Sequence, residues 1–138
     1  MPRRSEIVAE SRKWLGTPYH HQGRVLGHGV DCYGVIEMVG RAFGIEVPEN
    51  ISYSRIPDER HLLGCMDKYA VRIAVQDMKP GDIVIMPFLS QMRHMGIVTD
   101  IGVLHAWEPV GKVVEHALDG AWRRLIRRAY QYPGGING

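Results

Sequence analysis

The sequence predicts one α+β domain over residues 1–138, with N-terminal helices packed on one face of an antiparallel sheet of about five or six strands. Apolar residues at helical spacing are confined to the first half of the chain. Short runs rich in Val and Ile, separated by glycine, fill the second half. A chain of 138 residues has room for one core of ordinary size, so we expect a single domain.

The composition is that of a folded protein, since 45% of the residues are hydrophobic and 23% are charged. Seventeen basic residues against 15 acidic ones leave a net charge of +2, which gives no reason to expect a nucleic-acid partner. The first ten residues lack the apolar stretch of a secretory signal. Pro87 interrupts the longest apolar run, over 83–89. We therefore predict neither a signal peptide nor membrane insertion.

Three helices are predicted in the first half. The first, over 5–15, carries apolar residues on one side and stops before Gly16. Residues 17–30, rich in Gly and His, read as a loop. Asp31 can cap a second helix over 32–43, and a weaker pattern predicts a short helix over 58–69 after an irregular stretch.

A meander of antiparallel strands is predicted after a Pro-Gly turn at 80–81, where Asp82 would hold the start of the first strand. The expected strands cover 82–88, 94–100, 103–108, 112–118 and 122–131. Four arginines in the last segment fit either a basic helix face or an edge strand, and we favour the edge strand. They are Arg123, Arg124, Arg127 and Arg128.

Cys32 is the candidate nucleophile, because it begins the second predicted helix. The positive end of the helix dipole and unpaired backbone amides would lower its pKa and favour the thiolate. The same amides could stabilise an oxyanion on a substrate carbonyl. The alternative is a buried core residue, since free cysteine on an apolar helical stripe is usually buried.

His94 and His105 flank a predicted hairpin, and the parity of its turn decides whether they cooperate. With a two-residue turn at 100–101, Gly96 faces His105, and His94 lies diagonally from His105 on the same face of the sheet. With a three-residue turn, the imidazoles would point to opposite faces. If they cooperate, Cys32 would be the nucleophile, His94 the general base and His105 the residue that orients it.

Five segments of the chain, taken together in order and spacing, resemble the NlpC/P60 cysteine peptidases. They are Gly16-Thr17-Pro18-Tyr19, Gly29-Val30-Asp31-Cys32-Tyr33-Gly34, Pro80-Gly81-Asp82, His94-Met95-Gly96-Ile97 and His105-Ala106. Residues 105–133 are similar to the short tail-associated members encoded by bacteriophages and gene transfer agents. The resemblance covers nearly the whole chain.

The resemblance implies a papain-like core with Cys32, His94 and His105 as catalytic residues and no cofactor. It implies hydrolysis of peptidoglycan stem peptides, typically between D-isoglutamate and diaminopimelate. Tyr19 and Asp31 match supporting residues beside the nucleophile, although packing alone and helix capping alone explain them equally well. Tyr33 departs from the family, where many members carry serine, and this puts the shape of the pocket in doubt.

The same resemblance implies phage tail-tip proteins as partners. The protein would reside in the virion tail, or in the host cytoplasm during assembly, and would act at the cell wall. Two alternatives stay open at this point: a structural tail-tip protein with little hydrolase activity, and an amidase or acyltransferase on the same fold.

Three histidines before Cys32, and the second cysteine, could also take part in chemistry. His20, His21 and His28 precede Cys32, but their spacing fits no zinc pattern, and we expect no metal site. Cys65 lies on the weaker predicted helix, and burial is a better explanation for it than a partnership with Cys32.

Overall fold

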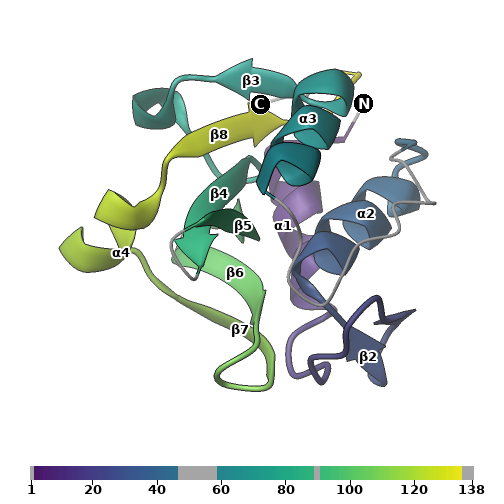
Figure 1. The fold of residues 1–138 in the computed structure, drawn as a ribbon. Helices are drawn as coiled ribbons and strands as arrows, with labels where there is room; N and C mark the ends of the chain where they lie inside the picture. Colours follow the sequence, from purple (N-terminus) through teal and green to yellow (C-terminus); the bar gives the residue numbers. More distant parts are fainter. Residues whose placement is uncertain (1, 47–58, 89–90, 135–138) are drawn as a thin grey trace.

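The computed structural model describes residues 2–46, 59–88 and 91–134. Its centre is a six-stranded antiparallel sheet with the strand order β3-β8-β4-β5-β6-β7 (Figure 1). The strands are β3 (Val71–Ile73), β4 (Ile83–Phe88), β5 (Gln91–Val98), β6 (Gly102–Trp107), β7 (Lys112–Ala117) and β8 (Arg128–Gln131). The helices are α1 (Arg4–Arg12), α2 (Cys32–Ala42), α3 (Glu59–Tyr69) and α4 (Gly120–Leu125), with a 3-10 turn, η1 (Val75–Asp77). This is the predicted α+β fold.

Helices cover the two faces of the sheet unequally. In Figure 1, α1, α2 and α3 lie on one side of the sheet and α4 lies on the other. The larger apolar cluster joins the first three helices to the sheet through Ile7, Ile36, Met66, Met95 and Leu104, among others. A smaller cluster on the opposite face contains Val84, Met86, Val98, Val103 and Ile126, with Trp122 of α4 packed against it. The side chains of β5 and β6 alternate between these clusters.

The helices in the first half follow the sequence pattern. α2 begins and ends close to the predicted positions, and Gly44 just beyond it adopts the left-handed φ of +73° that favours glycine. α1 is shorter than predicted, and Leu15 is exposed although it was expected on the buried side. α3 buries Leu62 and Met66 as expected. The predicted irregular stretch lies mostly outside the described residues.

The predicted loop at 17–30 contains a short hairpin of two strands, β1 (Arg24–Val25) and β2 (Gly29–Val30). This prediction was wrong because two-residue strands carry no detectable alternation. The segment before the hairpin links it to the tip of the β6–β7 hairpin, since Tyr19 forms a bridge with Val30 of β2 and its N–H donates to the carbonyl of Gly111 at 2.8 Å. No helix in the described residues is both long and apolar enough to cross a membrane.

The C-terminal part of the predicted meander was also wrong. Residues expected to form a strand over 122–131 form α4 followed by β8, because Asp119 caps a helix by accepting a hydrogen bond from the N–H of Trp122. β8 then crosses back to lie between β3 and β4. Arg123 and Arg124 therefore lie on α4, and Arg128 lies on an interior strand rather than an edge strand.

Candidate active site

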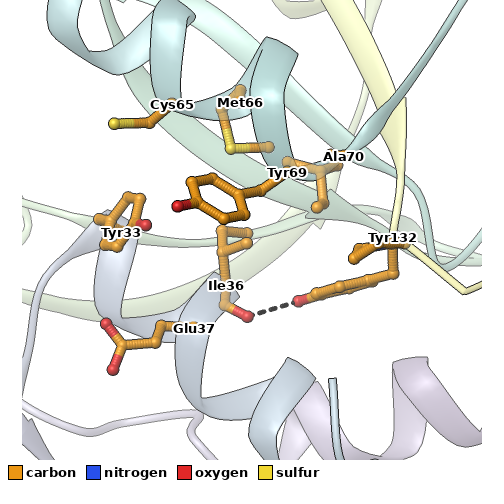
Figure 2. A pocket seen from close by; sticks show the side chains of 10 residues that line it. Tyr33, Ile36, Glu37, Cys65, Met66, Tyr69, Ala70 and Tyr132 are labelled. Carbon is orange, nitrogen blue, oxygen red and sulfur yellow. Dashed lines mark hydrogen bonds between the residues drawn. The ribbon is translucent and has the colours of Figure 1, made fainter. Parts of the chain in front are cut away.

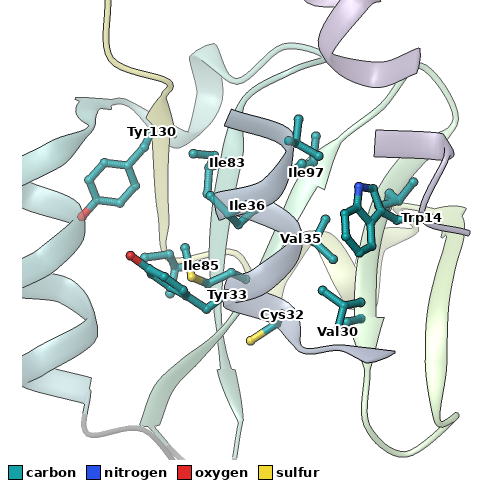
Figure 3. Packing of buried hydrophobic residues seen from close by; sticks show 14 of the residues in the cluster. Trp14, Val30, Cys32, Tyr33, Val35, Ile36, Ile83, Ile85, Ile97 and Tyr130 are labelled. Atoms are coloured by element: carbon teal, nitrogen blue, oxygen red, sulfur yellow. The ribbon is translucent and has the colours of Figure 1, made fainter. Parts of the chain in front are cut away.

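Cys32 lies at the first position of α2, against the sheet (Figure 3). Asp31 caps this helix, because its carboxylate accepts a hydrogen bond from the N–H of Gly34 at 2.8 Å. The backbone N–H groups of Met95 and Tyr33 donate to the Cys32 sulfur. The sulfur is thus fixed between the start of α2 and β5, at the peptide group that joins His94 to Met95.

The hydrogen-bonded ladder between β5 and β6 is short. The ladder between these strands consists of two pairs, Ile97–Leu104 and Val98–Val103. Beyond these pairs β5 continues beside β4, and β6 continues beside β7. The N–H of Met95 therefore donates to Cys32 where an unbroken ladder would direct it to the neighbouring strand. The Cys32 sulfur therefore lies at the backbone of Met95, the residue that follows His94.

The expected activation of the Cys32 thiol is not present in this structure. Cys32 is only 9% exposed, and its pKa is raised to about 12, chiefly by burial and secondly by the charge of Asp31. The two backbone N–H donors and the charge of Arg24 lower the pKa, but by less. The prediction of a depressed pKa was wrong because burial outweighs the helix terminus.

The β5–β6 hairpin has the turn that brings His94 and His105 together. The N–H of Thr99 donates to the carbonyl of Gly102 at 2.9 Å, which leaves Asp100 and Ile101 as a two-residue turn. Nε2 of His94 contacts Nδ1 of His105 within hydrogen-bond distance, and the ring centroids are 4.7 Å apart. Of the two turn lengths that the sequence leaves open, the two-residue turn is present, and the imidazoles share one face of the sheet.

Gly96 makes this pairing sterically permissible. A Cβ atom at this position would lie 2.7 Å from a methyl group of Val103 and 3.4 Å from the Cβ of His105. Any larger residue would push β6 away from β5. Glycine therefore permits the close approach of the strands beside the imidazoles.

His116 on β7 extends the pair to three imidazoles, and sequence reasoning missed it. Its Nε2 lies 2.8 Å from Nε2 of His105, and its Nδ1 lies 3.0 Å from the carbonyl oxygen of Ala117. The signal was present in the spacing, because 94, 105 and 116 are each 11 residues apart. Equal spacing across two successive hairpins of the same parity places all three on one face.

The first two imidazoles are buried and neutral. Burial lowers the pKa of His94 to about 3, and the charge of His116 adds to this effect. Burial lowers the pKa of His105 to about 2, with smaller contributions from His94 and His116. Aromatic rings line the three: Trp107 lies 4.9 Å from His94, and Trp122 lies 4.5 Å from His116 between ring centroids. We call His94, His105 and His116 the histidine row.

A charged network holds the other side of the site. The Asp31 carboxylate accepts hydrogen bonds from the N–H of Gln22 at 2.8 Å and from the Arg24 guanidinium at 3.0 Å. Arg24 also reaches Glu37 of α2 at 3.2 Å, and Glu37 bonds Arg41 at 3.0 Å. Asp31 and Glu37 are both buried, so these ion pairs fix the start of α2.

The predicted supporting and structural residues are placed as follows. Tyr19 is half-buried beside the apolar cluster that contains Cys32, and its backbone forms a bridge with Val30. Buried Asp82 accepts hydrogen bonds from Arg4 at 2.7 Å and from the N–H of Lys79 at 2.8 Å, which holds the start of β4 as expected.

Within the described residues, no group of three or more His, Cys, Asp or Glu side chains has the arrangement of a metal site.

Tyr33 points away from the sheet into a small apolar pocket between α2 and α3 (Figure 2). Cys65, Met66 and Tyr69 line this pocket on the α3 side. Cys65 is half-buried, and its sulfur lies 3.8 Å from Nε2 of His61. Both cysteines are free, and they lie on different helices, as expected.

Known proteins support the same fold. The profile of the NlpC/P60 family matches residues 16–128. The solved NlpC/P60 domain of the peptidoglycan hydrolase SagA is 23% identical with a TM-score of 0.69, over 94% of this chain and 98% of that one. An NlpC/P60 family protein from Bacillus cereus is 19% identical with a TM-score of 0.71, over 95% of this chain and 40% of that one.

A third solved structure is the peptidoglycan hydrolase RipB from Mycobacterium tuberculosis, which is 17% identical with a TM-score of 0.66 over 93% of this chain and 63% of that one. The search of curated proteins found no match. The family profile spans most of the chain, including Cys32, His94 and His105, and the solved structures share the fold. The chain belongs to the NlpC/P60 family.

Proposed function

We propose that this NlpC/P60 domain is a cysteine endopeptidase that hydrolyses peptidoglycan stem peptides. The observation that carries the proposal is that the thiol of Cys32, at the start of α2, accepts a hydrogen bond from the N–H of Met95, next in the chain to His94, and that His94 pairs with His105. A thiol, a base and an orienting group are the parts that acyl transfer requires.

The resting pKa values indicate how the reaction would start. Both Cys32 and His94 are neutral, so His94 would take the thiol proton as the sulfur attacks the substrate carbonyl. His94 would then return this proton to the leaving amine, and the acyl group would remain on the sulfur as a thioester. Water, deprotonated by His94, would hydrolyse the thioester and release the free enzyme. N–H groups in the first turn of α2 could stabilise the oxyanion.

The finer parts of the proposal are the bond and the setting. We assign the bond between D-isoglutamate and diaminopimelate, and an action in cell-wall penetration by a phage tail, with tail-tip proteins as partners. The likeness to SagA and RipB, both peptidoglycan hydrolases, supports the substrate class. The similarity of residues 105–133 to tail-associated members supports the setting.

The decisive experiment is mass spectrometry of fragments released from a defined stem peptide. We expect the wild type to cleave one amide bond, and Cys32→Ala to release no fragments. Cys65→Ala is the matched control, because it removes the other thiol without touching the site, and it should cleave normally. Equal cleavage by wild type and Cys32→Ala would contradict the proposal. Transfer of the acyl group to an added amine would identify an acyltransferase instead.

A structural tail-tip protein is the second candidate, and one observation favours it. Cys32 is nearly buried and its pKa is raised to about 12, which is unfavourable for a nucleophile. This candidate predicts that particles assembled with Cys32→Ala infect normally. A defect in infection together with loss of cleavage would exclude it.

A further inference from the structure

We propose that His116 is a positioning residue that fixes the tautomers of His105 and His94. In this arrangement the Nδ1 atom of His94 stays unprotonated and serves as the base. The effect on turnover rests on the proposed peptidase function, whereas the tautomers themselves do not depend on it.

The argument starts at the backbone carbonyl of Ala117, whose oxygen only accepts hydrogen bonds. Nδ1 of His116 lies 3.0 Å from this oxygen, so Nδ1 must carry the proton. A neutral imidazole has one N–H group, and Nε2 of His116 is therefore an acceptor. The carbonyl thus sets the direction of the first hydrogen bond.

The acceptor role of His116 then determines which nitrogen donates in each of the next two hydrogen bonds of the histidine row. Nε2 of His105 lies 2.8 Å from the acceptor Nε2 of His116, so it must be the donor. Nδ1 of His105 is left as an acceptor, and the N–H at Nε2 of His94 donates to it. His94 is left with a lone pair on Nδ1, on the other side of its ring from His105. This nitrogen is the one free to accept the Cys32 proton.

Burial of His94 and His105 among aromatic rings stabilises the donor and acceptor roles of these hydrogen bonds. His105 is fully buried and His94 is 5% exposed, so water does not replace their partners. Trp122 lies 5.5 Å from His105 and 4.5 Å from His116 between ring centroids, and Trp107 lies 5.4 Å from Trp122. The His94–His105 bond is buried, the His105–His116 bond is partly buried, and the bond from His116 to Ala117 is exposed. Reversing the buried member alone would leave two donors or two acceptors facing each other, which is costly away from water.

The first measurement is imidazole nitrogen NMR on the 15N-labelled wild-type protein at neutral pH, which reports which nitrogen of each ring carries the proton. We expect the Nε2–H tautomer for His94 and His105, and the Nδ1–H tautomer for His116. An Nδ1–H tautomer at His94 or His105 would overturn the proposal without any variant.

Two substitutions of His116 then separate tautomer control from packing. His116→Gln keeps an acceptor for the N–H of His105, so the Nε2–H tautomer of His94 should persist. His116→Lys offers only donors, so His105 and then His94 should reverse. We expect kcat for stem-peptide cleavage to fall about 10²-fold in His116→Lys with little change in KM, since a histidine in the wrong tautomer costs up to about 10⁴-fold in a serine triad. His116→Gln should stay within about fivefold of the wild type.

The controls are His28→Gln and His28→Lys, because His28 is exposed on the β1–β2 hairpin, away from the histidine row. Both should leave the tautomers and kcat unchanged. Retention of the Nε2–H tautomer of His94 in folded His116→Lys would overturn the proposal. If the tautomers behave as expected but the wild type cleaves no stem peptide, the proposed function fails and the role of His116 stands.

Discussion

The two halves of the candidate site are held by different forces. The thiol half is fixed by ion pairs, in which Arg24 joins the buried carboxylates of Asp31 and Glu37. The imidazole half is fixed by hydrogen bonds between the three rings of the histidine row and is lined by two tryptophans. The Cys32 thiol is thus positioned by charge, and the His94 imidazole is positioned by burial and hydrogen bonds.

This difference determines how each half responds to a perturbation. Buried ion pairs lose stability when one partner is removed, because the other charge stays buried. The two buried imidazoles, His94 and His105, are sensitive to acid, because the folded state cannot accept the protons that the unfolded state takes up. Acid should therefore reduce the stability contributed by the imidazole half, and substitution of one charged partner should reduce the stability contributed by the thiol half.

The largest effect should come from acid acting on the imidazole half. His94 and His105 have pKa values lowered from 6.5 to about 3 and about 2, so stability is complete above pH 6.5 and decreases as the pH falls below it. At pH 5 each histidine should cost about 2 kcal/mol, which is about 4 kcal/mol together. Urea unfolding at pH 7 and pH 5 measures this difference.

The matched variants assign the acid effect to the histidine row. His105→Gln should remove about half of the loss between pH 7 and pH 5, whatever its stability at pH 7. His28→Gln, which changes an exposed histidine, should lose as much as the wild type. An unchanged pH dependence in His105→Gln would show that this imidazole titrates normally in the folded protein.

Removal of Arg24 should give the next largest effect, on the thiol half. Arg24→Leu leaves Asp31 and Glu37 without their shared cation, although Arg41 still reaches Glu37. We expect the free energy of unfolding to fall by about 3 kcal/mol at pH 7. Arg3→Leu is the control, because Arg3 forms only an exposed pair with Glu6 at 3.8 Å and should cost less than about 0.5 kcal/mol. Equal losses would mean that the buried network contributes nothing.

The same comparison shows what the sequence could predict. The hairpin that joins His94 to His105 was predictable from side-chain alternation, but the length of its turn, which decides whether the two rings share a face, was left open. The start of α2 was predictable from the capping residue Asp31. The C-terminal crossover of β8 was not, since the position of a strand in a sheet depends on contacts distant in sequence.

The pKa of Cys32 was mispredicted for a related reason. The helix terminus is a local feature that favours the thiolate, and the sequence reveals it. Burial beneath the sheet and the charge of Asp31 raise the pKa, but the extent of burial depends on the assembled fold. His116 was missed although its spacing from His105 repeats that of His105 from His94. Its hydrogen bond to the backbone carbonyl of Ala117 has no signature in the sequence.

The smallest predicted effect concerns the opposing influences of Asp31 and Arg24 on the pKa of Cys32. Asp31→Asn keeps the side-chain acceptor that caps α2 but removes a negative charge that raises the pKa of Cys32. The pKa of Cys32 should therefore fall in Asp31→Asn. It should rise in Arg24→Leu, since the charge of Arg24 lowers the pKa of Cys32. A decrease of about one unit increases the thiolate fraction about tenfold, which corresponds to about 1.4 kcal/mol. Alkylation by iodoacetamide at pH 8 in a Cys65→Ser background measures both variants. Rates that change in the same direction would show that access to the buried sulfur, rather than its ionisation, limits the reactivity of Cys32.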